Sequence, residues 1–165
     1  MSPEVDAADL EPADSAAVAL NYTWLRAGVV VLDVSGLPLF PPLPLGPGLY
    51  RFDFGLDDDG RRAVYIGEGK SIAKRAVQYR NANDDRKRAL TSRRLRRAVV
   101  DHLATGQKIE MSVIVAAHFA NGSTFNFGQK SGRLLVESAA VMLAQLDTTV
   151  CVLNVDHDQV AGLDG

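Results

Sequence analysis

The chain has 165 residues, of which 47% are hydrophobic, so it can bury one core but is short for two separate domains. No apolar run approaches the roughly 20 residues that a membrane-spanning helix needs, which excludes a membrane partner. The single cysteine, Cys151, excludes an intrachain disulfide and a cysteine-based zinc site. Residues 1–14 are acidic and contain no Lys or Arg, unlike the start of a secretion signal, so we expect a soluble, cytoplasmic protein.

The formal net charge of −2 hides a strong separation of charge along the chain. Residues 61–97, called here the basic block, hold thirteen Lys and Arg residues against three acidic ones, and the remainder is net acidic. Such a block attracts a polyanion even when the whole protein is acidic. It therefore predicts a nucleic-acid partner, the alternative being a solvated helix face with no partner.

The N-terminal part of the chain predicts little regular structure. Residues 1–19 are rich in Ala, Asp, Glu and Pro and lack apolar periodicity, which predicts a mobile acidic tail. The next unit, residues 20–47, contains an apolar, β-branched stretch at 28–34 that is typical of a strand. Residues 41–47 are too rich in proline for a helix or a central strand. We expect one strand and then a stiff, extended connector.

A β-hairpin is predicted next. Residues 49–54 alternate between apolar and polar, residues 57–60 (Asp-Asp-Asp-Gly) have turn chemistry, and residues 63–66 resume the strand. The hairpin predicts that Tyr50 and Tyr65 lie near each other on two antiparallel strands.

Two helices are predicted after the hairpin. Ser71 can cap a helix that ends near Arg80, and a second helix covers about residues 91–104 before Gly106 ends it. His102 lies on the apolar side of the second helix, which favours a core or boundary histidine over a metal ligand. The predicted inner faces consist of Ile72, Ala73, Ala76 and Val77 in the first helix and Leu95, Ala98, Val99 and Leu103 in the second.

The C-terminal part adds a strand, a loop and a helix. Residues 109–116 predict a third core strand, and residues 121–128 predict a polar loop in which Phe125 and Phe127 are exposed. A helix is expected over residues 131–146. A short strand or coil is then expected at residues 150–155.

This order of elements, β-β-α-α-β-α with the hairpin first, predicts an α/β fold of the α+β kind rather than a doubly wound parallel sheet. We expect a small, three-stranded, mainly antiparallel sheet flanked by helices, with an added N-terminal strand. Residues 48–156 would form the domain and residues 157–165 a C-terminal tail.

One pair of motifs resembles a known family. Gly48-Leu49-Tyr50 is followed fourteen residues later by Val64-Tyr65-Ile66-Gly67. The pair is similar to the motif that names the GIY-YIG endonucleases, with Leu49 in place of isoleucine, and the resemblance covers residues 48–154. It implies the fold of a compact, restriction-enzyme-like member of that family.

The resemblance continues downstream. The family has an essential arginine on the helix after the second motif, which corresponds to Arg75, and a histidine or tyrosine one turn later, which corresponds to Tyr79. A metal-binding glutamate on a later helix looks like Glu137, and a late asparagine looks like Asn154. These residues imply hydrolysis of DNA with Mg²⁺ or Mn²⁺ as the cofactor.

Phosphodiester hydrolysis needs an activated water and neutralisation of charge on the phosphoryl oxygens. We expect Glu137 to bind the metal ion and Arg75 to contact the phosphate. Tyr50 or Tyr65 is the expected general base, which requires a lowered phenol pKa, and Lys70 on the turn before the helix could lower it. The N-terminus of that helix could also hold the phosphate, although the P-loop pattern around Gly69-Lys70-Ser71 is incomplete.

Each residue also has a structural interpretation. The tyrosines could be packing residues in strands, Arg75 a surface residue, and Arg133 with Glu137 a simple pair on a helix surface. Against the last interpretation, Glu137 lies within an apolar stretch, where a carboxylate is poorly placed unless a cation faces it.

We therefore predict a divalent-metal-dependent DNA endonuclease with a role in restriction, repair or mobile-element cleavage. A homodimer would allow it to cut both strands. The alternative is a nucleic-acid-binding module with the same fold and no activity. The residues expected to bind DNA are Arg93, Arg94, Arg96, Arg97 and Asn154.

Overall fold

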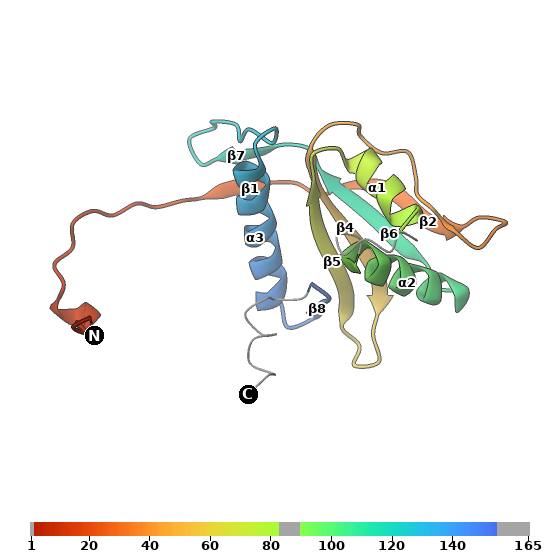
Figure 1. Ribbon diagram of the computed structural model, residues 1–165, viewed down its shortest axis with the longest axis horizontal. Coiled ribbons are helices and arrows are strands. Elements are labelled where there is room, and N and C mark those ends of the chain that lie inside the picture. Colours follow the sequence, from red (N-terminus) through yellow and green to blue (C-terminus); the bar gives the residue numbers. More distant parts are fainter. Residues whose placement is uncertain (1, 83–89, 155–165) are drawn as a thin grey trace.

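The computed structural model describes residues 2–82 and 90–154. It is an α+β fold in three layers, with α1 and α2 on one face of a central sheet and α3 on the other (Figure 1). The predicted C-terminal tail at residues 157–165 and the middle of the basic block lie outside the described residues. The elements are a 3-10 turn Ala7–Asp9, β1 Leu20–Tyr22, β2 Leu25–Leu32, β3 Pro38–Leu39, β4 Gly48–Leu56, β5 Arg62–Gly69, α1 Ile72–Arg80, α2 Leu90–Ala104, β6 Ile109–Ile114, β7 Ala117–Phe119, α3 Lys130–Leu146 and β8 Val150–Val152.

The central sheet has six strands in the order β3-β2-β6-β4-β5-β8. The three predicted core strands β4, β5 and β6 and the added N-terminal strand β2 are all present. They pair with one another in antiparallel fashion, whereas β5 pairs with β8 in parallel. The sheet is larger than the predicted three strands plus one, because β3 and β8 add a strand at each edge. Of these two, β8 lies where a short strand or coil was expected, and β3 was not predicted. A separate two-stranded sheet of β1 and β7 was also not predicted.

The hairpin of β4 and β5 is confirmed. Tyr50 lies opposite Gly67, and Phe52 lies opposite Tyr65, so the two tyrosines sit one step apart on the same face of the sheet. The turn closes through a bond from the Gly60 backbone N–H to the carbonyl of Asp57 at 3.0 Å. Gly60 has a φ of +74°, a conformation that favours glycine.

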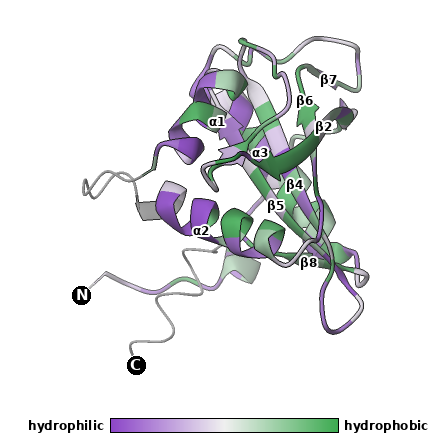
Figure 2. Cartoon of the chain, turned by 90° about the vertical axis from the view of Figure 1, so that its right-hand side faces the viewer, coloured by the Kyte–Doolittle hydropathy of each residue, from purple (hydrophilic) through white to green (hydrophobic). Residues whose placement is uncertain are grey.

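A hydrophobic core lies on each face of the sheet. The first core lies between the sheet and the helices α1 and α2, with Tyr50, Phe52, Ile72 and Val99 among its members. Figure 2 shows that α2 carries both hydrophilic and hydrophobic residues, as an amphipathic helix must. The second core lies under α3. Its buried members are Leu49, Ile66, Ile114, Ala117, Phe125, Phe127, Val136 and Ala140.

The predicted inner faces of α1 and α2 are correct in part. Val77 is 55% exposed, and Tyr79 takes the inward position instead with 1% exposed. Ala98 is likewise exposed on α2, while Leu95 and Val99 are buried. The difference arises because α1 packs against the aromatic side chains of β4. The Tyr79 ring contacts those of Tyr50 and Phe52 edge to face and so lies in the core.

The predicted exposure of Phe125 and Phe127 was wrong. Their side chains are 8% and 5% exposed, and Phe125 stacks on Phe119 with ring centroids 4.0 Å apart. The loop around them is polar in composition, but these two rings close one end of the second core. Hydrophobic burial outweighs the local loop signal here.

The N-terminal residues 2–19, called here the arm, extend away from the body of the molecule (Figure 1). All of them are exposed, and their only regular structure is the 3-10 turn. Their predicted mobility stays a prediction. In the described part of the chain no helix is long and apolar enough to span a membrane.

Candidate active site

The two motif glycines are required by close approaches of neighbouring side chains and backbone. A Cβ atom on Gly67 would lie 2.3 Å from the hydroxyl oxygen of Tyr50, and a Cβ on Gly48 would lie 2.3 Å from the carbonyl oxygen of Ile114. Real Cβ atoms do not come this close to other heavy atoms. Gly67 therefore makes the space in which the Tyr50 ring lies across β5.

Three tyrosines pack together where α1 meets β4 and β5: Tyr50 of β4, Tyr65 of β5 and Tyr79 of α1. They are called here the tyrosine cluster. The Tyr50 and Tyr79 hydroxyls share a hydrogen bond, and their rings meet edge to face with centroids 5.8 Å apart. The Tyr65 ring stacks with that of Tyr50 at 6.5 Å. Tyr50 and Tyr79 are buried, whereas Tyr65 is only half-buried, so Tyr65 is the member best placed to contact solvent.

Arg75 of α1 faces the tyrosine cluster. Its guanidinium carbon lies 4.8 Å from the centre of the Tyr79 ring, and its Nε donates to the Tyr50 hydroxyl over 3.5 Å. One terminal nitrogen donates to Gln78 at 2.9 Å. Among the described residues Arg75 forms no ion pair with a carboxylate, so its charge is available to an anion next to the cluster.

The tyrosines do not have the lowered pKa that a free general base would need. Burial raises the pKa of all three phenols above the ordinary value of 10.0, with Tyr79 raising that of Tyr65 further and Arg75 opposing the rise. Lys70 is exposed at the turn into α1 and is not among the groups that shift these pKa values. In this environment the phenols are neutral hydrogen-bonding groups.

Glu137 is carried by α3, on the other face of the sheet, and is half-buried. Its carboxylate interacts electrostatically with Glu68, Arg75 and Tyr65. Burial first, and Glu68 second, raise the pKa of Glu137 from 4.5 to about 7. Glu137 therefore lies within electrostatic range of Tyr65 and Arg75.

The suggested helix-surface pair between Arg133 and Glu137 is not formed. Arg133 instead donates from Nε to the carboxylate of Glu68 on β5 at 2.5 Å, and it is buried. Glu137 has no ion pair within the described residues. Glu68 was not predicted as a site residue. One signal in the sequence could have indicated it: a charged residue directly follows the motif glycine Gly67 within a strand that is otherwise mostly buried.

The donor set suits a hard divalent cation. Glu137 is a half-buried carboxylate with no ion pair among the described residues, and Arg75 offsets its burial only in part, so a bound cation would stabilise its charged form. The described residues contain no group of three His, Cys, Asp or Glu side chains able to hold a metal. An ion at Glu137 would therefore complete its coordination with water and phosphate oxygens, as Mg²⁺ often does.

Asn154 serves the backbone of the site strand. Its side-chain amide accepts from the Ile66 N–H at 2.9 Å and donates to the Ile66 carbonyl at 2.5 Å. Both hydrogen-bonding groups of the amide are thus used at the edge of β5, just beyond the point where β8 stops pairing. The structure gives Asn154 a part in holding β5, a different part from the predicted contact with DNA.

The N-terminus of α1 is already satisfied by the chain. The connector supplies the carbonyls of Gly46 and Pro44 to the N–H groups of Ile72 and Ala73, at 3.1 and 3.0 Å, and the Ser71 hydroxyl caps Lys74. The expectation that this helix end holds a phosphate was therefore wrong, because its first donors are taken.

The predicted DNA-binding arginines lie together on α2. Arg94 and Arg97 are exposed, while Arg93 and Arg96 are half-buried. The four line two shallow hollows that both include Asp101. The part of the basic block that lies on α2 therefore forms one continuous surface. Residues 83–89 of the block lie outside the described residues.

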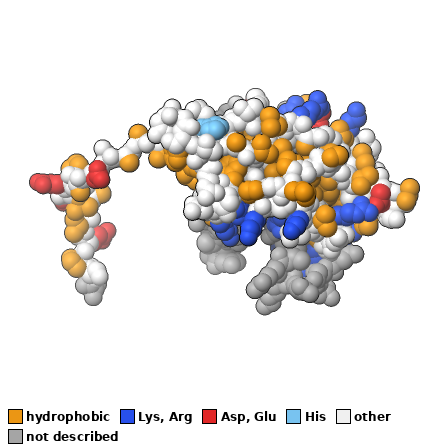
Figure 3. All heavy atoms as spheres, turned by 90° about the horizontal axis from the view of Figure 1, so that it is seen from above, with side chains coloured by type: hydrophobic (Ala, Val, Ile, Leu, Met, Phe, Trp, Pro, Cys, Tyr) orange, Lys and Arg blue, Asp and Glu red, His pale blue; other side chains and the backbone are white. Residues whose placement is uncertain are grey.

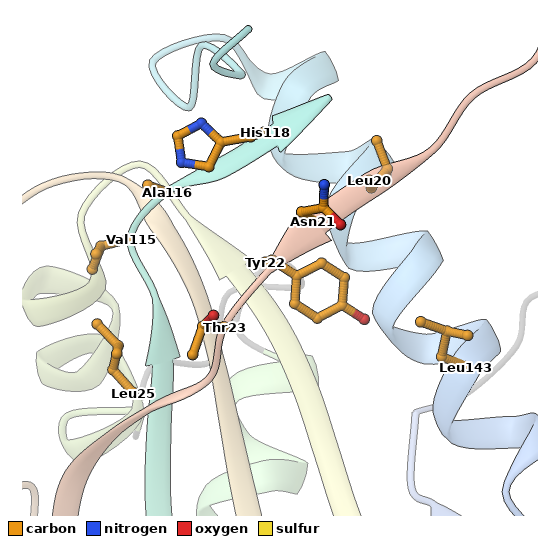
Figure 4. Close-up of a pocket in the computed structure, with 9 residues that line it drawn as sticks. All are labelled: Leu20, Asn21, Tyr22, Thr23, Leu25, Val115, Ala116, His118 and Leu143. Atoms are coloured by element: carbon orange, nitrogen blue, oxygen red, sulfur yellow. The ribbon is translucent and has the colours of Figure 1, made fainter. Parts of the chain in front are cut away.

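A further groove lies between β1, the end of β6 and α3 (Figure 4). Tyr22, His118 and Leu143 are among its lining residues, and none of the predicted site residues lines it. His102, in contrast, packs edge to face against Phe54 at 5.2 Å, which confirms its expected place at the core boundary.

Comparisons with models of known protein families and with curated proteins give no match. Among solved structures, the chain is similar to a mutant of bacteriophage T4 EndoII, with 19% sequence identity over 73% of this chain and 86% of that chain and a TM-score of 0.48.

Proposed function

We propose that the protein is a divalent-metal-dependent endonuclease that hydrolyses phosphodiester bonds of DNA. The observation that supports this proposal is that Glu137 lies near enough to Arg75 and Tyr65 to interact with both electrostatically, while Arg75 packs on the tyrosine cluster. A carboxylate that lacks an ion pair among the described residues, next to a guanidinium and neutral phenols, has the charges that a metal ion and a phosphate would complement.

Each residue then has a distinct part in the reaction. Arg75 binds the non-bridging oxygens of the phosphate, and Glu137 holds the cation. A bound Mg²⁺ or Mn²⁺ would supply Lewis-acid stabilisation of the departing oxygen. Tyr65, the most accessible phenol, orients the attacking water, and Tyr50 and Tyr79 hold Arg75 and Tyr65 in place.

Proton removal from the water needs more than the phenols alone. Their raised pKa values keep them neutral at pH 7, so a tyrosine can accept the water's proton only while it passes its own proton on or while a nearby positive charge favours the phenolate. The Arg75 guanidinium is the positive charge that favours the phenolate of Tyr65. Because Tyr65 is only half-buried, it would lose its own proton to solvent before accepting that of the attacking water. Lys70 remains a candidate to interact with the phosphate from the exposed turn before α1.

The arginines of α2 would bind the DNA backbone beside the site. Binding of this kind depends steeply on salt, because each phosphate contact releases counterions. Cleavage of both strands by a single site per chain further favours a homodimer, which light scattering of the protein with and without DNA would detect.

Supercoiled plasmid with Mn²⁺ or Mg²⁺ tests the proposal. The wild type is expected to nick or linearise it, and both Glu137→Ala and Arg75→Ala are expected to abolish cleavage. Sequencing the cleaved ends would then define the target. Salt-sensitive DNA binding that survives Glu137→Ala, with no metal-dependent cleavage of any DNA or RNA by the wild type, would instead establish the non-catalytic binding module.

A further inference from the structure

Arg133 is the most constrained charged side chain next to the candidate site. Its side chain is 7% exposed, and its Nε donates to the Glu68 carboxylate at 2.5 Å. One terminal nitrogen donates to the carbonyl of Phe127 at 2.8 Å and lies 3.4 Å from that of Gly128. Arg133 thus ties α3 to β5 and to the loop before α3.

The same loop is seated closely on the first turn of α3. A Cβ on Gly132 would lie 2.7 Å from the carbonyl oxygen of Asn126. Phe125 and Phe127 anchor the loop in the second core. The first turn of α3 is therefore held by β5 through Glu68 and by the loop before the helix. Glu137 follows Arg133 by one helical turn, so its position depends on these contacts.

Glu68 matters because it is the second carboxylate close to Glu137. Leu49 lies opposite Glu68 in the hairpin and belongs to the second core, so Glu68 points to the face that α3 covers. Without a partner, the Glu68 carboxylate could turn toward any cation that Glu137 binds.

We propose that Arg133 is a positioning residue of the active site: by binding Glu68 it keeps that carboxylate from ligating the cation, so that Glu137 alone presents a free carboxylate. This inference rests on the proposed function. It assigns the Glu68–Arg133 pair the task of setting both the charge and the number of protein ligands at the site.

The charges of the three groups give a clear expectation. With Glu68, Arg133 and Glu137 all ionised, they sum to one negative charge. Arg133→Met leaves two negative charges and frees Glu68, Glu68→Gln leaves none, and the double variant Glu68→Gln/Arg133→Met restores the original value. Affinity for a divalent cation should follow this order.

The experiment measures the Mn²⁺ affinity of the full chain without DNA, by electron paramagnetic resonance of free Mn²⁺. We expect about tenfold tighter binding for Arg133→Met, about tenfold weaker binding for Glu68→Gln, and a value within about threefold of the wild type for the double variant. Arg133→Lys keeps the positive charge and is expected to stay close to the wild type.

Loss of packing alone would give a different pattern. Breaking a buried ion pair from one side is destabilising, so Arg133→Met could fail to fold, whereas removing both partners is often tolerated. Circular dichroism identifies the folded variants. If Arg133→Met does not fold, Arg133→Gln takes its place, because it also removes the positive charge but keeps a hydrogen-bonding side chain beside the intact Glu68 carboxylate. Tighter Mn²⁺ binding than the wild type supports the proposal, and an unchanged affinity overturns it.

Failure of this inference is distinguishable from failure of the proposed function. If folded Arg133→Met binds Mn²⁺ no more tightly than the wild type, while Glu137→Ala abolishes binding, only the positioning role is overturned. If the wild type and Glu137→Ala bind Mn²⁺ equally, both the metal site and the role of Arg133 are overturned.

Discussion

The residues of the candidate site lie where charge is disfavoured. Burial raises the pKa of the phenols and of Glu137 alike, and the guanidinium of Arg75 is the nearby cation that opposes this rise. A site of this kind is unfavourable for the folded protein alone and favourable once a cation and a phosphate are bound. Stability and function should therefore respond in opposite directions to changes at Glu137.

Replacing Glu137 by glutamine should stabilise the protein above neutral pH. The folded-state pKa of about 7 lies above the ordinary 4.5, so the protonated carboxyl favours folding below pH 4.5, and this contribution is lost as the pH rises through 7. Allowing for partial exposure, Glu137→Gln should raise the free energy of unfolding by about 1 kcal/mol at pH 8. Urea denaturation at pH 8 and pH 4 without divalent ions measures it.

The difference should vanish at pH 4, where both side chains are neutral. Glu11→Gln on the exposed arm serves as the control and should leave the free energy of unfolding unchanged at both pH values. A Glu137→Gln protein that is less stable than the wild type at pH 8 would show that the carboxylate has a cationic partner in solution.

A methyl group at position 67 should disturb both the fold and the tyrosine cluster. In Gly67→Ala the new Cβ would clash with the Tyr50 ring, which must then move. Overpacking of this kind costs about 1–3 kcal/mol. Thermal unfolding measures the loss, with Gly46→Ala as the matched control because no atom lies within 4 Å of its added Cβ. Equal losses in both variants would contradict the packing argument.

Among the elements, the long ones could be predicted from sequence and the short ones could not. The alternation in residues 49–54 and 63–66 is a local property of the sequence, and so are the apolar stripes of the helices. The hairpin and the helices were therefore predicted correctly, including the helix that carries Glu137. Strands of two or three residues, such as β1, β3 and β7, exist only because a neighbouring strand pairs with them. No local pattern marks them.

The site shows the same division. Tyr50, Tyr65, Arg75 and Glu137 could be chosen from the motif resemblance, and the structure brings them together. The Glu68–Arg133 pair spans 65 residues of sequence and depends on how α3 packs on β5, so its partners could not be matched from sequence. The pairing of Arg133 with Glu68 was decided by tertiary packing.

The edge of β5 gives a prediction at the scale of the element. Asn154→Ala removes both hydrogen bonds to Ile66, and each contributes about 1 kcal/mol to stability. We expect a loss of about 1–2 kcal/mol and faster hydrogen exchange of the Ile66 amide, measured by NMR. The Phe52 amide, in the centre of the sheet, serves as the reference for the change in global stability. An Ile66 rate that rises no more than the Phe52 rate would show that the Asn154 hydrogen bonds do not protect the Ile66 amide locally.

At the scale of the whole molecule, charge is divided between the arm and the body. Figure 3 shows acidic side chains along the arm and basic ones on the body. The acidic residues of the arm are all exposed, and none of its side chains enters either core. The arm should therefore affect binding of a polyanion more than it affects folding. Its acidic residues are Glu4, Asp6, Asp9, Glu11 and Asp14.

Deleting residues 1–19 should leave the free energy of unfolding within about 0.5 kcal/mol of the full chain, because nothing buried is removed. Affinity for DNA at low salt should rise by about threefold, because five negative charges are lost, and the gain should fade at high salt. Fluorescence anisotropy over a salt series measures both effects. A gain that is independent of salt would point to a steric effect of the arm.

The site also divides between two layers of the protein. The tyrosine cluster belongs to the core under α1 and α2, and Arg75 of α1 packs on it, whereas Glu137 is carried by α3 over the other core. Loosening either layer separates the carboxylate from the guanidinium, even when the opposite layer keeps its packing. On heating, the proposed nuclease activity should consequently be lost at the temperature where the less stable layer unfolds, below the temperature at which the whole chain loses its helical signal.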